Sequence, residues 1–194
     1  MEKAEQIKKY INLTVGKNIT ELKDVESLKI LEAEWISKIL ALNETIDVLD
    51  YGAGFGFITN AIANKVNFVH TYDVDQNWIK LCENNCHTHN NIKHHGPSIE
   101  SLHDIKVNTI LLKDVVENFT FDHFVQTFNM FDTIAKPNCK IFFNFYNQEF
   151  YNEDNNDKSH FTIEQIQQIA NNINYKIVLL EKNKLYSFVL LKKQ

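Results

Sequence analysis

A cluster of glycines in the first third of the chain is the segment best suited to bind a ligand. The sequence has five glycines, and three of them lie within five residues, at Gly52, Gly54 and Gly56. They follow an apolar run over residues 46–49 and open a helical pattern over residues 56–65. Glycines between a strand and a helix permit a tight turn and let a ligand approach the backbone closely. The spacing therefore predicts a turn that binds a nucleotide-type cofactor.

Acidic residues near this turn indicate the charge of the ligand. Asp50 lies two residues before Gly52, and Asp73 ends the next predicted strand, at the ribose-binding position about 20 residues after the turn. A dinucleotide fingerprint would place a glycine at position 57, where this chain has Phe57. The Asp50 carboxylate would repel a pyrophosphate, but it would attract the sulfonium and ammonium of S-adenosylmethionine. The pattern favours this methyl donor over NAD.

Longer segments around these residues resemble one protein family. VLDYGAGFG at residues 48–56 and TYDVD at residues 71–75 look like the motifs of class I S-adenosylmethionine-dependent methyltransferases, the seven-stranded β-sheet family. TILLKDVVE at residues 109–117 resembles the family's fourth strand and the turn after it. AKPNCK at residues 135–140 resembles the lead into its fifth strand. The resemblance covers about residues 45–192.

The resemblance implies a fold, a cofactor and a set of binding residues. The fold is α/β and doubly wound, with a mostly parallel seven-stranded sheet in the order 3-2-1-4-5-7-6, strand 7 antiparallel and helices on both faces. The implied cofactor is S-adenosylmethionine. The residues expected to bind it are Asp50, Tyr51, Gly52, Ala53, Gly54, Gly56, Asp73, Val74, Ser98, Lys113 and Asp114.

The family implies a different contact for each part of this set. The turn over residues 52–54 approaches the cofactor, Asp73 holds both ribose hydroxyls, and Val74 packs on the adenine. Lys113 or Asp114 contacts the methionine end.

Two segments depart from patterns seen in relatives. Many relatives have Gly-Asp after the third strand, whereas residues 96–98 here are Gly-Pro-Ser, so Ser98 or the backbone must replace the usual acidic contact to adenine. A catechol-type magnesium site needs carboxylates after the fourth and fifth strands. Asp114 supplies one, but residues 144–146 are Asn-Phe-Tyr. We therefore predict no magnesium site.

An alternation of strands and helices is expected to position these residues. The predicted strands cover residues 46–49, 67–72, 91–95, 109–112, 140–145, 175–180 and 185–191, and the last two form a hairpin. The predicted helices that follow the first strand cover residues 56–65, 75–85, 120–134 and 161–173. Asp75 and Thr162 are the expected N-caps of two of them. The polar segment 147–159 is predicted to be a surface loop.

The domain organisation expected from this pattern is simple. Residues 1–42 form an N-terminal helical cap, residues 43–194 form a Rossmann-like core, and together they make one domain over residues 1–194.

Composition limits the partners and the compartment. All 20 basic residues are Lys and the net charge is −5, so the bidentate Arg contacts used to read guanine are unavailable and nucleic acid is not an expected partner. No apolar run approaches the roughly 20 residues that span a bilayer. The N-terminal sequence has no secretory signal pattern, which favours a cytoplasmic protein with reduced cysteines.

A tract rich in cysteine and histidine raises the possibility of a zinc site. It contains Cys82, Cys86, His87, His89, His94 and His95. The spacing matches no closed zinc finger, because the two cysteines share one helix face and His94 and His95 project from opposite faces of a strand. We interpret the tract as core thiols and loop histidines, and predict no metal site.

The expected reaction is transfer of the sulfonium methyl group to a small-molecule acceptor. The acceptor is expected between the N-terminal helices and the 147–160 loop, with His160 as the candidate catalytic residue because histidine takes up a proton near neutral pH. Glu117, His123 and Tyr146 are weaker candidates for that role. The alternatives are a protein methyltransferase, a non-catalytic methyltransferase-fold partner or regulatory subunit, and an NAD-dependent oxidoreductase.

Overall fold

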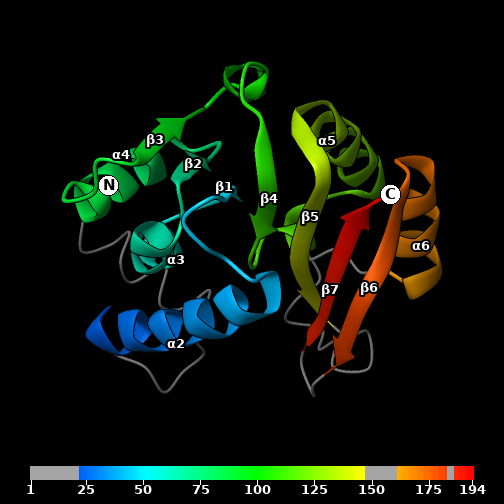
Figure 1. The fold of residues 1–194 in the computed structure, drawn as a ribbon, viewed down its shortest axis with the longest axis horizontal. Helices are drawn as coiled ribbons and strands as arrows, with labels where there is room; N and C mark the ends of the chain where they lie inside the picture. Colours follow the sequence, from blue (N-terminus) through cyan, green and yellow to red (C-terminus); the bar gives the residue numbers. More distant parts are fainter. Residues whose placement is uncertain (1–21, 147–160, 183–185) are drawn as a thin grey trace.

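The computed structural model describes residues 22–146, 161–182 and 186–194, which contain one seven-stranded sheet (Figure 1). Its strand order is β3-β2-β1-β4-β5-β7-β6. Strands β1 to β5 pair in parallel, and β7 pairs antiparallel to both β5 and β6. The predicted order and the antiparallel seventh strand are confirmed. The strands are β1 (Asp47–Tyr51), β2 (Phe68–Tyr72), β3 (Ile92–His95), β4 (Val107–Leu112), β5 (Ala135–Tyr146), β6 (Tyr175–Lys182) and β7 (Tyr186–Lys193).

Helices cover both faces of the sheet, as predicted. The helices are α2 (Leu22–Leu40), α3 (Phe57–Ile62), α4 (Gln76–Cys86), α5 (Phe121–Ile134) and α6 (Ile163–Asn172), with 3₁₀ turns η1 (Ala63–Lys65), η2 (Ile99–Leu102) and η3 (Val116–Asn118). Successive residues of a strand point to opposite faces. Phe142 accordingly packs in the core under α2 and α3, while its neighbour Phe143 packs in the core under α5 and α6.

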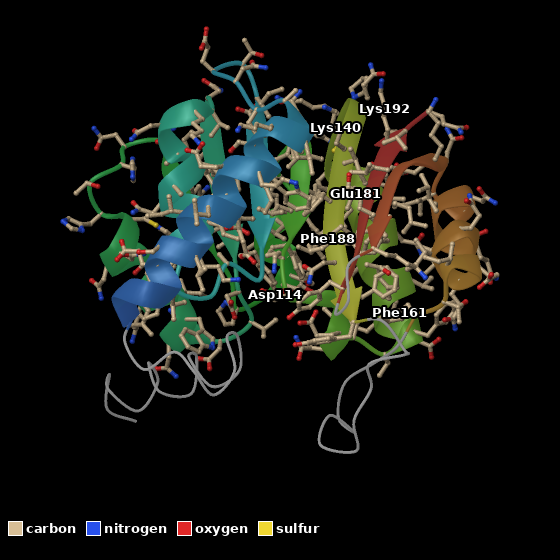
Figure 2. All side chains as sticks on the ribbon, turned by 90° about the horizontal axis from the view of Figure 1, so that it is seen from below. Asp114, Lys140, Phe161, Glu181, Phe188 and Lys192 are labelled. Carbon is tan, nitrogen blue, oxygen red and sulfur yellow. The ribbon has the colours of Figure 1, made fainter. Side chains whose placement is uncertain are left out.

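Helix α2 is the described part of the expected N-terminal cap. It crosses in front of the sheet in Figure 2 and packs on the same face as α3. Trp35 anchors it, with ring centroids 5.7 Å from Phe142 and 5.0 Å from Phe188 in edge-to-face geometry. Residues 1–21 lie outside the described part of the chain. No helix in the described ranges combines the length and apolar character that a membrane span needs.

Side-chain caps fix the starts of several helices. The Asp75 carboxylate accepts a hydrogen bond from the Asn77 backbone N–H at 2.8 Å, and Thr162 with Gln165 forms a capping box at α6. Both predicted caps are confirmed. Helix α3 begins at Phe57 because its N-cap, Gly56, has a φ of +79°. The predicted helix over residues 56–65 is therefore a short α-helix followed by the turn η1.

The fifth strand is longer than the sequence pattern indicates. It begins at Ala135, which pairs with Val107, whereas the predicted strand begins at residue 140. A register shift between Val107 and Thr109 accommodates the Lys-Pro-Asn segment at residues 136–138. Strands β6 and β7 pair as the predicted hairpin, while residues 183–185 between them and the predicted surface loop over residues 147–159 lie outside the described ranges.

Candidate functional site

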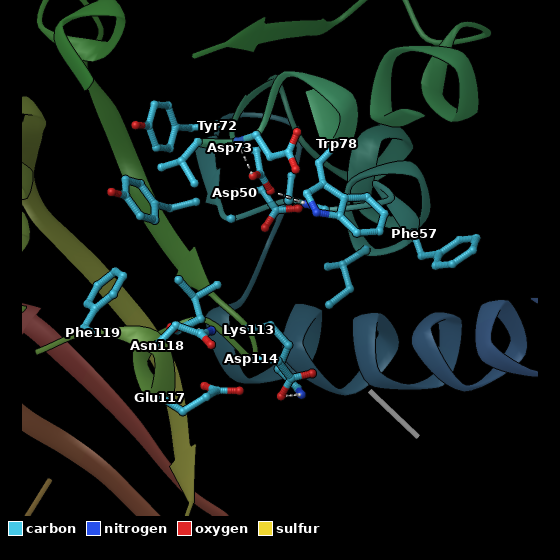
Figure 3. A pocket seen from close by; sticks show the side chains of 18 of the residues that line it. Asp50, Phe57, Tyr72, Asp73, Trp78, Lys113, Asp114, Glu117, Asn118 and Phe119 are labelled. Atoms are coloured by element: carbon cyan, nitrogen blue, oxygen red, sulfur yellow. Dashed lines mark hydrogen bonds and ion pairs between the residues drawn. The ribbon is translucent and has the colours of Figure 1, made fainter. Parts of the chain in front are cut away.

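A cavity of about 420 Å³ opens at the carboxyl ends of β1, β2 and β4, where α/β folds of this kind bind ligands (Figure 3). Nine of the eleven predicted cofactor-binding residues line it, namely Asp50, Tyr51, Gly52, Ala53, Gly54, Asp73, Val74, Lys113 and Asp114. The fold thus brings together side chains from three separate segments of the sequence.

The glycine turn is held against the end of β2. The backbone N–H groups of Gly52 and Ala53 both donate to the Tyr72 carbonyl oxygen, at 2.7 and 3.1 Å. Gly52 has a φ of +77°, and a Cβ atom there would lie 2.5 Å from Cγ2 of Val115. Both the conformation and the close contact require glycine. The turn therefore has no side chain between its backbone and the cavity at this point.

Asp73 joins the turn to β2 through its carboxylate. Its Oδ2 accepts from the Gly54 N–H at 3.0 Å, and its Oδ1 accepts from the Asp75 N–H at 3.1 Å. Burial raises the pKa of Asp73 above its ordinary value, although these backbone donors act in the opposite direction. A carboxylate offers about four acceptor positions. These donors do not fill the carboxylate, so it can still accept a hydrogen bond from a hydroxyl group of a ligand in the cavity.

Asp50 supplies a second carboxylate from the end of β1. It is only 4% exposed, and it accepts a hydrogen bond from the Thr59 hydroxyl at 2.5 Å. Burial raises the pKa of Asp50 to about 6. A buried carboxylate with a raised pKa gains most from a nearby positive charge, so this part of the cavity favours a cationic ligand.

Asp114 is the centre of a buried ion cluster at the end of β4. Its carboxylate lies 2.8 Å from the Lys29 ammonium and 2.5 Å from the Lys113 ammonium. The Asn144 amide donates to Asp114 Oδ1, and the Asp114 N–H donates to Asn144 Oδ1, each at 2.9 Å. Burial by itself would raise the pKa of Asp114, but the two ammonium groups hold it well below its usual range. The Asp114 carboxylate is thus engaged by protein donors.

Lys29 belongs to α2 and lines the cavity, but it is not among the site residues predicted from the sequence. It is 6% exposed and also pairs with Glu32 at 2.8 Å. It lies in a helical pattern with no local signal of a site, so only the packing of α2 on the sheet brings it to the cavity. Its ammonium and that of Lys113 bring two positive charges to one carboxylate at this end.

The far wall of the cavity is formed by η3 and the start of α5. Glu117, Asn118, Phe119 and His123 line it, and Glu117 is only 4% exposed. The rings of Phe119 and His123 lie 4.3 Å apart. Two of the weaker acceptor-site candidates, Glu117 and His123, are therefore in the cavity wall. Tyr146 does not line the cavity, and its hydroxyl accepts from that of Tyr186 at 3.1 Å.

Two expected cofactor-binding residues and the expected catalytic residue are placed differently. Gly56 does not line the cavity, and a Cβ there would lie 2.6 Å from Cys82 Sγ on α4, so this glycine permits helix packing. Ser98 is exposed and occupies the N-cap position of η2, outside the cavity wall. His160 and the rest of the 147–160 segment lie outside the described residues.

The cysteines and histidines of the central tract have other contacts. Cys82 and Cys86 are buried free thiols on one face of α4. His94 bonds to the Thr71 hydroxyl at 2.8 Å, and His95 bonds to His70 at 2.9 Å from the opposite face of β3. In the described ranges, no three His, Cys, Asp or Glu side chains gather where they could hold a metal ion.

The fold of this chain is similar to that of solved methyltransferase structures. No family model matches the sequence, and no curated protein sequence matches it. A magnesium protoporphyrin IX methyltransferase from Synechocystis PCC 6803, solved with bound S-adenosylhomocysteine, superposes with a TM-score of 0.74 and 11% identity over 100% of this chain and 95% of its own. A S-adenosylmethionine-dependent methyltransferase from Aquifex aeolicus superposes with a TM-score of 0.69 and 17% identity over the full length of both chains. At such identities the likeness shows a shared fold.

Proposed function

We propose that this protein, which has the fold of the class I S-adenosylmethionine-dependent methyltransferases, is itself such an enzyme and methylates a small molecule. The observation that carries the proposal is the joining of the glycine turn to Asp73 at the wall of a 420 Å³ cavity. A turn of bare backbone beside a carboxylate with unused acceptor positions suits an adenosine ribose. The nearby Asp50 carboxylate suits a cationic ligand and disfavours a pyrophosphate.

Each end of the cofactor would have its own set of residues. Asp73 would hold the ribose hydroxyls, and Val74 would pack against the adenine. Lys29 and Lys113, which Asp114 holds together, would face the carboxylate of the methionine end. Opposite charges in a site that excludes water attract more strongly than they do in solvent. This arrangement assigns Asp114 an indirect role, because its carboxylate orients the two lysines.

The bound cofactor supplies an electrophilic methyl group, so little covalent chemistry is needed from the chain. What the chain contributes is alignment and exclusion of water. Glu117 and His123 line the wall beyond Asp114, where either could accept a proton from a hydroxyl or amine. His160 stays a prediction for the same role.

Two observations support a small acceptor. Glu117 and His123, the two candidate proton acceptors, line the cavity and do not lie on an open face of the protein. Helix α2 borders the same cavity through Lys29. The Synechocystis neighbour carries a small molecule, magnesium protoporphyrin IX, in its name. A buried acceptor site of this kind suits a compact molecule better than a folded protein surface.

Isothermal titration calorimetry with S-adenosylhomocysteine and NAD tests the proposal. We expect S-adenosylhomocysteine to bind and to raise the melting temperature. At a ligand concentration 100 times its dissociation constant, binding adds about 2.7 kcal/mol to the free energy of unfolding. NAD should do neither. Binding of NAD with no binding of S-adenosylhomocysteine would reject the cofactor assignment. Binding of S-adenosylmethionine without release of S-adenosylhomocysteine on any acceptor would favour a non-catalytic partner protein.

A further inference from the structure

Two apolar side chains stand beside Asp73 at the rim of the cavity. Val74 is 66% exposed and lines the cavity, so its side chain is accessible to a ligand. Trp78 lies one helical turn further on, in α4, and lines the same wall. Figure 3 shows the Trp78 side chain pointing toward Asp50 and Asp73. A flat aromatic ligand group next to a ribose held by Asp73 would contact both.

The segment after β3 is turned away from this wall. None of residues 96–99, all of them described, lines the cavity. Gly96 packs against the end of β2, since a Cβ on it would clash with the carbonyl oxygen of Asp73. This turn therefore lies behind the Asp73 backbone.

Three polar backbone groups of this turn bond to side chains of the protein. The Gly96 N–H donates to the Ser101 hydroxyl oxygen at 3.1 Å, and that hydroxyl donates to the Ser98 carbonyl oxygen at 2.7 Å. The Pro97 carbonyl oxygen accepts from the Tyr72 hydroxyl at 3.0 Å. Proline has no N–H to offer. These groups are therefore bonded to the side chains of Tyr72 and Ser101.

Asp75 is a further acidic side chain that lines this end of the cavity. Its Oδ1 accepts from both the backbone N–H and the side-chain amide of Asn77, at 2.8 and 3.0 Å. This carboxylate serves as the N-cap of α4.

We infer that the site recognises the purine of its cofactor by the faces of the ring, through Trp78 and Val74, and does not read the 6-amino edge. The inference rests on the proposed function and narrows it. A stacked aromatic side chain accepts any purine, because every base has a π face. A site that pairs with an edge rejects an altered base about 5- to 150-fold, because a buried polar group is left unmatched. Cofactor analogues with a changed 6-position should therefore bind.

S-inosylhomocysteine, in which a 6-oxo group replaces the 6-amino group, is the decisive probe. Calorimetry on the full chain should give a dissociation constant within about fivefold of that for S-adenosylhomocysteine, below the usual loss for an unmatched edge. A loss greater than about fivefold overturns the inference and leaves the proposed function intact. If S-adenosylhomocysteine itself does not bind, the proposed function fails instead.

Variants of the wall test the role of the indole. Trp78→Leu should weaken both ligands equally, by about fivefold or more, and Trp78→Phe should keep most of the affinity because it keeps a ring. Asp75→Asn preserves the helix cap and should leave both affinities within about twofold. In a Trp35→Phe background, where Trp78 is the remaining tryptophan, either ligand should change the fluorescence. Unchanged fluorescence together with unchanged affinity in folded Trp78→Leu would overturn the inference.

Discussion

The Lys29 ammonium lies 2.8 Å from the Asp114 carboxylate, although 85 residues separate them, and this contact joins α2 to the end of β4. Both side chains are largely buried, and Lys113 and Asn144 complete the surroundings of the carboxylate. Glu32 on α2 also pairs with both lysines, at 2.8 and 3.5 Å, so two ammonium groups and two carboxylates gather at this end of the cavity. The pair therefore links the docking of α2 to the electrostatics of the site.

Lys29→Met should destabilise the protein because it removes one of two cations from a buried carboxylate. Breaking a buried pair costs about 3–5 kcal/mol. Lys113 remains beside Asp114, so we expect roughly 1–3 kcal/mol, the cost of an unmatched buried polar group. Urea denaturation measures the effect. Lys65→Met removes the exposed pair with Glu34 and should change stability by less than about 0.5 kcal/mol. Equal losses in the two variants would contradict a special role for Lys29.

Asp50 should make stability depend on pH in a direction opposite to most carboxyl groups. Its folded-state pKa of about 6 lies above its ordinary value of 3.8, so the folded protein binds this proton more tightly than the unfolded chain. The resulting stability is complete below about pH 4 and is lost as pH rises through 6. Asp50→Asn removes the titration. The stability of wild type minus that of Asp50→Asn should fall between pH 4 and pH 7 in urea melts, whereas a constant difference would show that Asp50 does not titrate in this range.

Asp73→Ala should weaken binding of S-adenosylhomocysteine. Hydrogen bonds to a charged group contribute about 1.5–3 kcal/mol, which corresponds to roughly 10- to 150-fold in the dissociation constant. Calorimetry measures the change, and circular dichroism checks that the variant is folded. Asp122→Ala, on the exposed side of α5, serves as the control. An unchanged affinity in the folded Asp73 variant would remove this residue from the proposed site.

Gly52→Ala should be destabilising for two separable reasons. A left-handed conformation costs a residue with a Cβ about 1–2 kcal/mol. The new Cβ would also lie 2.5 Å from Val115 Cγ2, and overpacking of this kind costs about 1–3 kcal/mol. Adding Val115→Ala should recover the second loss and leave the first. If the stability lost in the double variant equals or exceeds the sum of the losses in the two single variants, the contact with Val115 does not limit the turn.

His160→Ala tests the predicted catalytic residue against those in the cavity wall. A positioned general base contributes about 10² to 10⁴ to turnover, so that loss is expected with the affinity for S-adenosylmethionine unchanged. Glu117→Gln and His123→Ala, made in parallel, measure the two residues that line the cavity. Methyl transfer by the His160 variant within about a factor of two of wild type would reject the base role. The role would then fall to whichever wall residue reduces turnover.

The sequence by itself determined the order of strands and helices along the chain and the wall of the site that contains the glycine turn, Asp50 and Asp73. Strand and helix periods are local, so the alternation after residue 45 predicts parallel strands with crossover helices and a final hairpin, whereas the strand order and the antiparallel seventh strand followed from the resemblance to the methyltransferase family. The glycines at positions 52 and 54 mark a turn that few other residues can form. Because the carboxyl ends of parallel strands meet at one edge, Asp50 and Asp73 had to lie near each other once the sheet was predicted.

The tertiary structure decided which distant residues complete the site. Lys29 comes from a helix whose sequence pattern indicates only an apolar face, and Trp78 comes from a helix that caps normally, so neither carries a local signal. Ser98 lies outside the cavity because its turn packs behind β2. Contacts across 85 residues depend on how helices settle on the sheet, and this packing is a property of the whole core that no window of sequence contains.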